Sequence, residues 1–164
     1  MLFVVMLGGK HPRANIEVHD VVFVLAEKLE EAYVQLREAW FGSAKGVHID
    51  AWMAVDGVAG WQVRMSDLAP GPDQPRLYFI NLGGYEPGAF GEAHRYELVV
   101  ARNKTEAKAQ ARAGMRRGWQ QGHLDALLDV DDCIPIDQVG GRYVQLVEGA
   151  HAGVQVRSDY IVLG

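Results

Sequence analysis

Cysteine and serine are scarce in this chain of 164 residues, and the scarcity excludes several kinds of site. Cys133 is the only cysteine, so no disulfide can form within the chain and no cage of thiolates can hold a metal ion. We expect Cys133 to be a small buried residue. The few serines do not recur in the repeat described below and form no Gly-x-Ser-x-Gly motif, which leaves nucleophilic serine catalysis without support.

Long apolar runs and an excess of basic charge are absent as well. No segment approaches the roughly 20 apolar residues that a membrane-spanning helix needs. Residues 1–7 are apolar but lack a basic leader, and they end at Gly8-Gly9, so we interpret them as a strand rather than a signal peptide. The net charge is −5 and no basic run occurs, which argues against a nucleic-acid partner. We expect a cytoplasmic protein with no membrane partner.

The chain does contain an internal repeat. With a shift of 75 residues, residues 2–9 match residues 77–84, and about 19 of the 56 pairs between residue 1 and Asp56 are identical. The sequence therefore divides into repeat 1 (about 2–76) and repeat 2 (about 77–164). A unit of this size is marginal for a hydrophobic core of its own. We predict one compact domain, residues 1–164, made of two fused repeats.

Hydrophobic periodicity predicts a β-α-β-β-β unit in each copy, with residues 2–7 as an extra leading strand. After the leading strand, the pattern predicts a strand over residues 18–26 and a helix over residues 27–40. Their counterparts in the second copy are a strand at 95–101 and a helix at 104–117. A strictly alternating strand follows at 47–56 and 123–131, and another at 61–65 and 143–147, with six extra residues near 134–139. The fold class is α+β: a mainly antiparallel sheet, two helices covering one face, and pseudo-two-fold symmetry. The alternation places Trp52 beside His48 and Asp50, as a candidate pocket floor.

Four polar positions recur between the copies. Glu17 and His19 return as Glu92 and His94, and His48 and Asp50 return as His123 and Asp125. Residues two apart on a strand project to the same side, so each repeat offers two carboxylate–imidazole pairs. Two imidazoles and two carboxylates suit Zn²⁺, Mn²⁺, Fe²⁺ or Ni²⁺. The same pairs could instead line a ligand pocket, or form hydrogen bonds that fix strand register.

Two further groups of residues are candidates for binding. Gly8-Gly9 and Gly83-Gly84 follow strands, where backbone amides could cradle an anion or a tight turn could use positive φ. No nucleotide-binding fingerprint accompanies them. Asp129, Asp131 and Asp132 resemble a set of ligands for a hard cation, but their spacing does not match a calcium loop. We interpret these three as a solvated turn.

The order Leu-Gly-Gly, Glu-x-His, helix and His-Ile-Asp resembles a small bacterial family known only as a domain of unknown function. Residues 1–19 are the most specific part of the resemblance. Members carry one or two copies of the unit, and the resemblance implies a two-copy form here. It implies no activity.

These observations favour a small cytoplasmic ligand-binding or accessory protein with a His/carboxylate site in each repeat. One alternative is a metal-dependent or general acid–base enzyme that uses the same His, Glu and Asp residues. A second alternative is a structural assembly module. No cofactor is predicted by motif, and a divalent metal is the one candidate. Expected partners are a small molecule and, through an unpaired first or last strand, a second copy of the chain.

Overall fold

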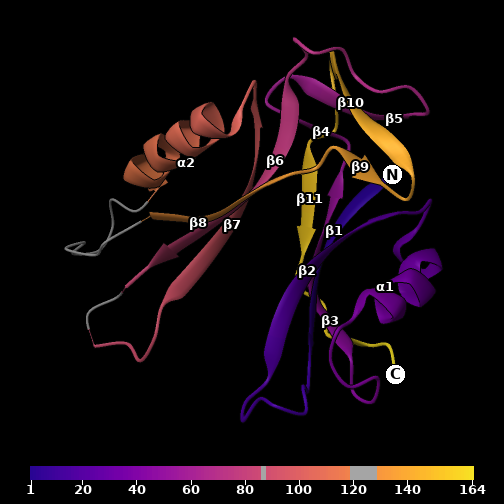
Figure 1. The fold of residues 1–164 in the computed structure, drawn as a ribbon, viewed down its shortest axis with the longest axis vertical. Coiled ribbons are helices and arrows are strands. Elements are labelled where there is room, and N and C mark those ends of the chain that lie inside the picture. Colours follow the sequence, from indigo (N-terminus) through magenta and orange to yellow (C-terminus); the bar gives the residue numbers. More distant parts are fainter. Residues whose placement is uncertain (86–87, 119–128) are drawn as a thin grey trace. The chain divides into compact units, whose positions relative to one another are not determined.

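The computed structural model describes residues 1–85, 88–118 and 129–164, which form two compact units. The first unit contains Met1–Val63, Val139–Gly141 and Gly149–Gly164, and the second contains Arg64–Gln138 and Arg142–Glu148. Figure 1 follows the elements along the chain. Within the described ranges, none of the helices has the length and apolar character that crossing a membrane requires.

The first unit is built on one antiparallel sheet. Its central strand is β1 (Leu2–Gly9), which pairs with β2 on one side and β3 on the other. The strand order is β11-β3-β1-β2, and β12 also pairs with β3. β1 is buried along nearly its whole length, which explains its continuous apolar run. The remaining elements are β2 (Val18–Leu25), η1 (Leu29–Ala32), α1 (Tyr33–Ala39), β3 (His48–Val55), β4 (Gly57–Val58), β5 (Trp61–Ser66), β11 (Val154–Arg157) and β12 (Ile161–Val162).

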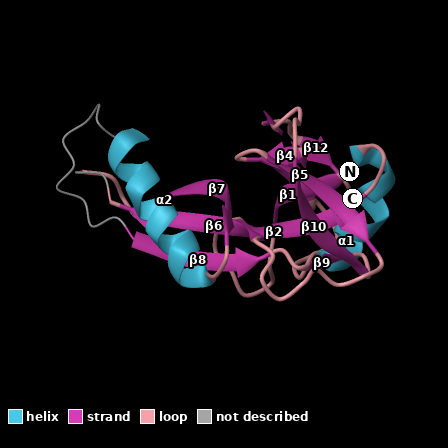
Figure 2. Cartoon of the chain, turned by 90° about the horizontal axis from the view of Figure 1, so that it is seen from above, coloured by secondary structure: helices cyan, strands magenta, loops and turns pink. Residues whose placement is uncertain are grey.

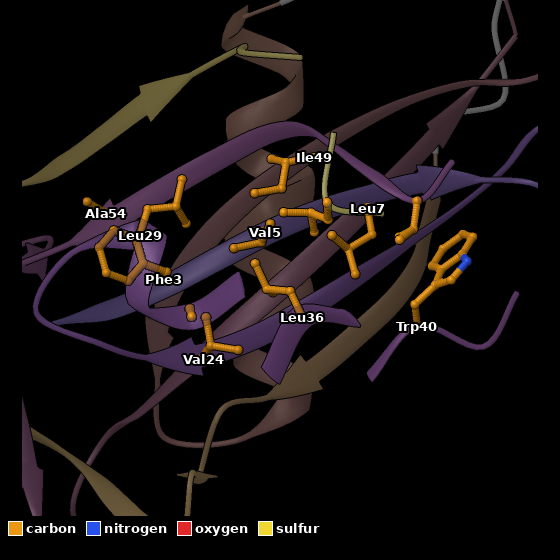
Figure 3. Close-up of a cluster of buried hydrophobic side chains, with 12 residues drawn as sticks. Phe3, Val5, Leu7, Val24, Leu29, Leu36, Trp40, Ile49 and Ala54 are labelled. Carbon is orange, nitrogen blue, oxygen red and sulfur yellow. The ribbon is translucent and has the colours of Figure 1, made fainter. Parts of the chain in front are cut away.

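Side chains from one face of this sheet pack against η1 and α1. Phe3, Val5 and Leu7 alternate along β1 and join Leu29 and Leu36 in one buried cluster, and Figure 3 shows these side chains together. The sequence predicted a single helix over 27–40, and the structure has a 3₁₀ turn followed by a short α-helix. The spacing of apolar residues was sufficient to find the buried side of this segment, because both helix types return to one face within three to four residues.

The second unit repeats this arrangement with the strand order β7-β6-β8. α2 (Lys104–Gly118) packs against all three strands, as Figure 2 shows. It starts with a capping box: the Asn103 side chain accepts a bond from the Glu106 N–H (2.9 Å), and the Glu106 carboxylate accepts one from the Arg102 N–H (2.9 Å). The strands of the second repeat are β6 (Arg76–Gly84), β7 (Ala93–Ala101), β8 (Asp129–Pro135), β9 (Gln138–Val139) and β10 (Arg142–Glu148).

The predicted α+β class, with mainly antiparallel sheets and two helices, is confirmed. Each repeat begins with a leading strand, β1 or β6, which is followed by a second strand, a helix and three more strands. Cys133 is buried, as expected. The central position of β1 also means that this first strand is not an open edge.

The six extra residues of the second repeat precede β8, so their predicted position near 134–139 is wrong. Gly8 pairs with His48, whereas Gly83 pairs with Asp129. The offset between the units is therefore 129 − 48 = 81 residues at these strands, not 75. The predicted counterparts of His48 and Asp50, His123 and Asp125, lie outside the described residues, and Asp129 and Asp131 take the corresponding strand positions.

A β-bulge interrupts each of these strand pairs at the same place. Leu7 pairs with Ile49 and Met6 with Ala51, so Asp50 is the extra residue on β3. Leu82 pairs with Val130 and Asn81 with Asp132, so Asp131 is the extra residue on β8. Bulges re-aim side chains and often lie beside functional sites.

The bulge also changes which side chains face the core. After Asp50 the alternation shifts by one residue, and Trp52 packs against the same cluster as Ile49. Its ring makes an edge contact with Phe3 at a centroid distance of 6.0 Å. The prediction that Trp52 floors a pocket beside His48 is therefore wrong, because a period of two assumed a strand without a bulge.

Candidate functional site

Three adjacent strands of the first unit bring four polar side chains around Gly8. His19 on β2 and His48 on β3 both pair with Gly8, one from each side. Asp50 is the bulge residue of β3, and Glu17 directly precedes β2. Because Leu7 points into the core beneath α1, Gly8 and the four side chains lie on the opposite face of the sheet. The structure thus brings together all four residues that the sequence singled out in repeat 1.

The ring nitrogens and carboxylate oxygens of this group converge. His19 Nε2 lies 3.5 Å from Glu17 Oε1 and 3.2 Å from Asp50 Oδ2. His48 Nε2 lies 3.4 Å from Glu17 Oε1 and 3.4 Å from Asp50 Oδ1. Glu17, His48 and Asp50 each offer a ligand atom within 4.8 Å of the others. Each carboxylate therefore faces both imidazoles.

His48 is the most constrained member of the group. Its side chain is 2% exposed, against 49% for His19, 41% for Glu17 and 30% for Asp50. Its Nδ1 lies 2.9 Å from the Gly46 carbonyl oxygen, which can only accept, so Nδ1 carries the proton. Its Nε2 and the Asp50 Oδ2 are buried and have no hydrogen-bond partner among the described residues. In neutral His48, a lone pair on Nε2 therefore points into the cluster.

The absence of a side chain at Gly8 leaves room for the side chains of His48 and Asp50. A Cβ on Gly8 would lie 2.5 Å from Asp50 Oδ2 and 2.6 Å from His48 Nε2. The interpretation of this residue as part of a tight turn with positive φ is wrong, since Gly8 lies inside β1 and does not have a positive φ. Gly9 has a separate role, because a Cβ there would lie 3.1 Å from the Trp40 ring. Gly84 is likewise a strand residue, paired with Ala93.

The second unit contains a related group of three residues. Glu92, His94 and Asp131 each offer a ligand atom within 4.8 Å of the others, and all three are exposed. His94 Nδ1 lies 3.4 Å from Asp131 Oδ2 and 3.1 Å from the Asn81 side-chain oxygen. A Cβ on Gly83 would lie 2.5 Å from Glu92 Oε1, so the glycine serves the same purpose as Gly8. Unlike His48 Nε2, however, His94 Nδ1 already has a hydrogen-bond partner.

Asp129 takes the place of His48 in this unit but does not join the group of three. Its Oδ1 accepts bonds from Arg112 Nε (3.1 Å) and Nη2 (2.7 Å) on α2. The hydrogen bond and charge of Arg112 lower the pKa of the Asp129 carboxyl below 3.8. Asp129, Asp131 and Asp132 belong to β8, so the interpretation of these three as a solvated turn is wrong.

Asp131 is thus a candidate site residue that the sequence interpretation missed. A signal for it existed: with a shift of 81, Ile49-Asp50 matches Val130-Asp131, and the same shift aligns the following strands. The ungapped register of 75 concealed this match, because His123-x-Asp125 repeats the letters of His48-x-Asp50. The alignment therefore matched identical residues, although the strand positions required a shift of 81.

The fold and the site define an α+β protein of two repeated units, with residues in each that could hold a metal ion. The model of the family described as Domain of Unknown Function (DUF1543) matches residues 14–65 and 89–139, and the chain belongs to this family in a two-copy form. The predicted resemblance is confirmed at this level.

A solved relative supports the fold over the full length. The crystal structure of protein Il1583 from Idiomarina loihiensis is similar to this chain, with 31% sequence identity and a TM-score of 0.73. The match covers 99% of this chain and 97% of that one. No curated protein matches this chain. The comparisons assign no activity, so function is argued from the site.

Proposed function

We propose that this protein binds one divalent first-row transition-metal ion through Glu17, His19, His48 and Asp50. The observation that carries the proposal is the buried Nε2 of His48, which lies among carboxylate oxygens without a hydrogen bond. Leaving a buried polar atom unpaired costs about 1–3 kcal/mol. A cation at this position would accept the lone pair and neutralise both carboxylates.

The distances favour a shared ion over direct hydrogen bonds. A charge-assisted bond between imidazole and carboxylate is about 2.7–2.9 Å long. The four nitrogen–oxygen distances between the two histidines and the two carboxylates are longer, at 3.2–3.5 Å. Ligands of a tetrahedral Zn²⁺ ion, with bonds of about 2.0–2.1 Å, are themselves about 3.3 Å apart. The separation of each imidazole nitrogen from the carboxylates is thus in the range found between ligands of one ion, and Glu17, His48 and Asp50 are the residues whose ligand atoms all lie within 4.8 Å of one another.

The chemistry of the ligands limits the choice of ion. Two imidazole nitrogens and two carboxylate oxygens suit Zn²⁺, Co²⁺, Fe²⁺ or Mn²⁺ rather than Ca²⁺, which takes six to eight oxygens. The Gly46 carbonyl orients His48 through Nδ1, as outer hydrogen bonds do for most metal-binding histidines.

General acid–base chemistry without a metal is the second candidate, and it uses the same residues. Its supporting observation is the position of His19, which is about half exposed and lies within 3.5 Å of both carboxylates. Without a metal, the buried His48 Nε2 could be paired only by donating a proton to Glu17 or Asp50. The distance of 3.4 Å to each oxygen does not supply that bond.

Metal titration tests the proposal. Chelator-treated protein is titrated with Co²⁺, followed by visible absorption, and with Zn²⁺ in competition. We expect one tight equivalent per chain with a tetrahedral Co²⁺ spectrum. His19→Ala and Glu17→Gln should each weaken binding at least tenfold, since each removes one ligand. His94→Ala is the matched control in the second unit and should leave the tight equivalent in place, because His94 already bonds to Asn81.

Two results would overturn the proposal. One is the absence of a tight equivalent in the wild-type protein. The other is binding that His19→Ala and His48→Gln leave unchanged. In either case, an activity that depends on His19 in metal-free protein would support the acid–base candidate instead.

A further inference from the structure

The end of the chain is bonded to the segment that carries His48. The Leu163 N–H donates to the Val47 carbonyl at 2.8 Å, and the Gly46 N–H donates to the Gly164 carbonyl at 3.1 Å. These two bonds lie immediately before His48 in the chain. The position of this imidazole therefore depends on residues more than a hundred positions away.

Gly46 connects the two sets of bonds. Its carbonyl accepts the 2.9 Å bond from His48 Nδ1, and its N–H is held by Gly164. Its φ of +81° is a conformation that residues with a Cβ rarely adopt. The bond from His48 Nδ1 to the Gly46 carbonyl determines which ring nitrogen carries the proton. The orientation of that carbonyl depends on the backbone conformation of Gly46, which the bond to Gly164 stabilises.

Tyr160 contacts the imidazole itself. The two rings have a centroid distance of 4.4 Å and an interplanar angle of 37°. Arg157 pairs with Trp52 and Ile161 pairs with Ile49, so Tyr160 belongs to the break between β11 and β12, opposite the bulge. Its side chain is 70% exposed while His48 is 2% exposed. The phenol ring therefore covers a ligand without itself being part of the core.

A side chain from α1 holds the same segment from the other face of the sheet. Arg37 Nη1 donates to the Leu163 carbonyl at 2.9 Å. In the second unit its counterpart Arg112 bonds to Asp129 instead, and no strand pairs with the outer edge of β8 among the described residues. Among the residues that the structure describes, a further strand lies beside the His48 position in the first unit and none lies beside the equivalent position of β8.

We propose that residues 160–164 are the positioning element of the first unit's metal site. They hold the Gly46–His48 segment by backbone bonds and cover His48 with the Tyr160 ring, so that Nε2 faces the ion before the ion binds. The inference rests on the proposed metal site and adds a determinant of its affinity outside the four ligands.

The test compares Co²⁺ binding by full-length variants at a temperature where each is folded. Tyr160→Ala removes the ring, and Arg37→Gln removes the bond to Leu163 without touching the site. We expect each to weaken Co²⁺ binding about tenfold, within the range known for residues behind metal ligands, and to alter the visible spectrum. Tyr160→Phe keeps the ring and should restore wild-type binding. Val156→Ala, an exposed change on the neighbouring edge strand β11, is the matched control.

The outcomes separate this inference from the proposed function. Wild-type affinity and spectrum in both Tyr160→Ala and Arg37→Gln would overturn the positioning role while leaving the metal site intact. Weakening by Val156→Ala equal to that by Tyr160→Ala would also overturn it, since a general loosening of the edge strand would then suffice. If the wild-type protein itself takes up no Co²⁺ through His48, the proposed function fails and this inference fails with it.

Discussion

At the scale of single residues, the site depends as much on an absent side chain as on the four that are present. Gly8 pairs with both His19 and His48, and a Cβ on this residue would point into the space between their side chains and Asp50. Gly8 is explained not by a turn but by the close approach of the His48 and Asp50 side chains to the backbone. Gly83 has the same relation to Glu92 in the second unit.

Gly8→Ala should therefore abolish tight metal binding. The new methyl carbon would lie 2.5 Å from Asp50 Oδ2 and 2.6 Å from His48 Nε2, and at least one of them must move. We expect the Co²⁺ affinity to fall more than tenfold, measured by titration together with a melting curve. Gly71→Ala, where the Cβ would make only an ordinary 3.7 Å contact, is the control. Wild-type affinity in Gly8→Ala would contradict this account of the glycine.

At the scale of secondary-structure elements, the cap of α2 can be predicted from the sequence, whereas the two β-bulges cannot. The start of α2 at Lys104 follows from a local pattern, Asn-x-x-Glu, because the bonds join residues three or four apart. The bulges at Asp50 and Asp131 leave no such local mark, since they are defined by the partner strand. The faces of β3 were therefore predicted correctly only up to the bulge.

Glu97 on β7 provides a test by pH. Burial raises the pKa of its carboxyl above 4.5, and its Oε1 has no partner among the described residues. Because the folded protein binds this proton more tightly than the unfolded chain, the charged form destabilises the fold as pH rises through the raised pKa. We expect Glu97→Gln to be more stable than wild type at pH 7 by up to about 1 kcal/mol, since the side chain is partly exposed. The advantage should vanish below about pH 4.5, where both states are protonated.

Chemical denaturation at several pH values measures this difference. Glu148→Gln, at an exposed position on β10, should show no such pH-dependent gain. An advantage of Glu97→Gln that is constant from pH 3 to pH 7 would mean that ionisation of Glu97 is not its cause.

At the scale of the whole molecule, the chain consists of two units with their own buried clusters. The sequence predicts that two units of about 75 residues fold as one domain, because each is marginal by itself. The boundary between the units falls within β5, and the ends of the chain both belong to the first unit. Association of two copies stays a prediction, and of the two strands named for it, only the last lies at a sheet edge.

A core substitution in the first unit tests whether folding is shared. Leu36 is fully buried beneath the sheet, so Leu36→Ala should cost about 2–5 kcal/mol. We expect a single transition, with amides of β1 and β6 losing protection from hydrogen exchange together. Leu68→Ala, at an exposed position, should change neither. Loss of protection confined to the first unit would show that the units unfold independently.

The sequence by itself determined the duplication, the α+β class, most strand and helix positions, and the four site residues of the first unit. These features follow from hydrophobic periodicity and from internal repetition, because both depend only on the order of residues along the chain. The tertiary structure alone decided that Asp131 takes the bulge position of Asp50 in the second unit, that Trp52 packs against the core, and that Gly8 leaves room for the His48 and Asp50 side chains. Each of these depends on pairing between strands far apart in sequence, where one extra residue at a bulge reverses every face that follows.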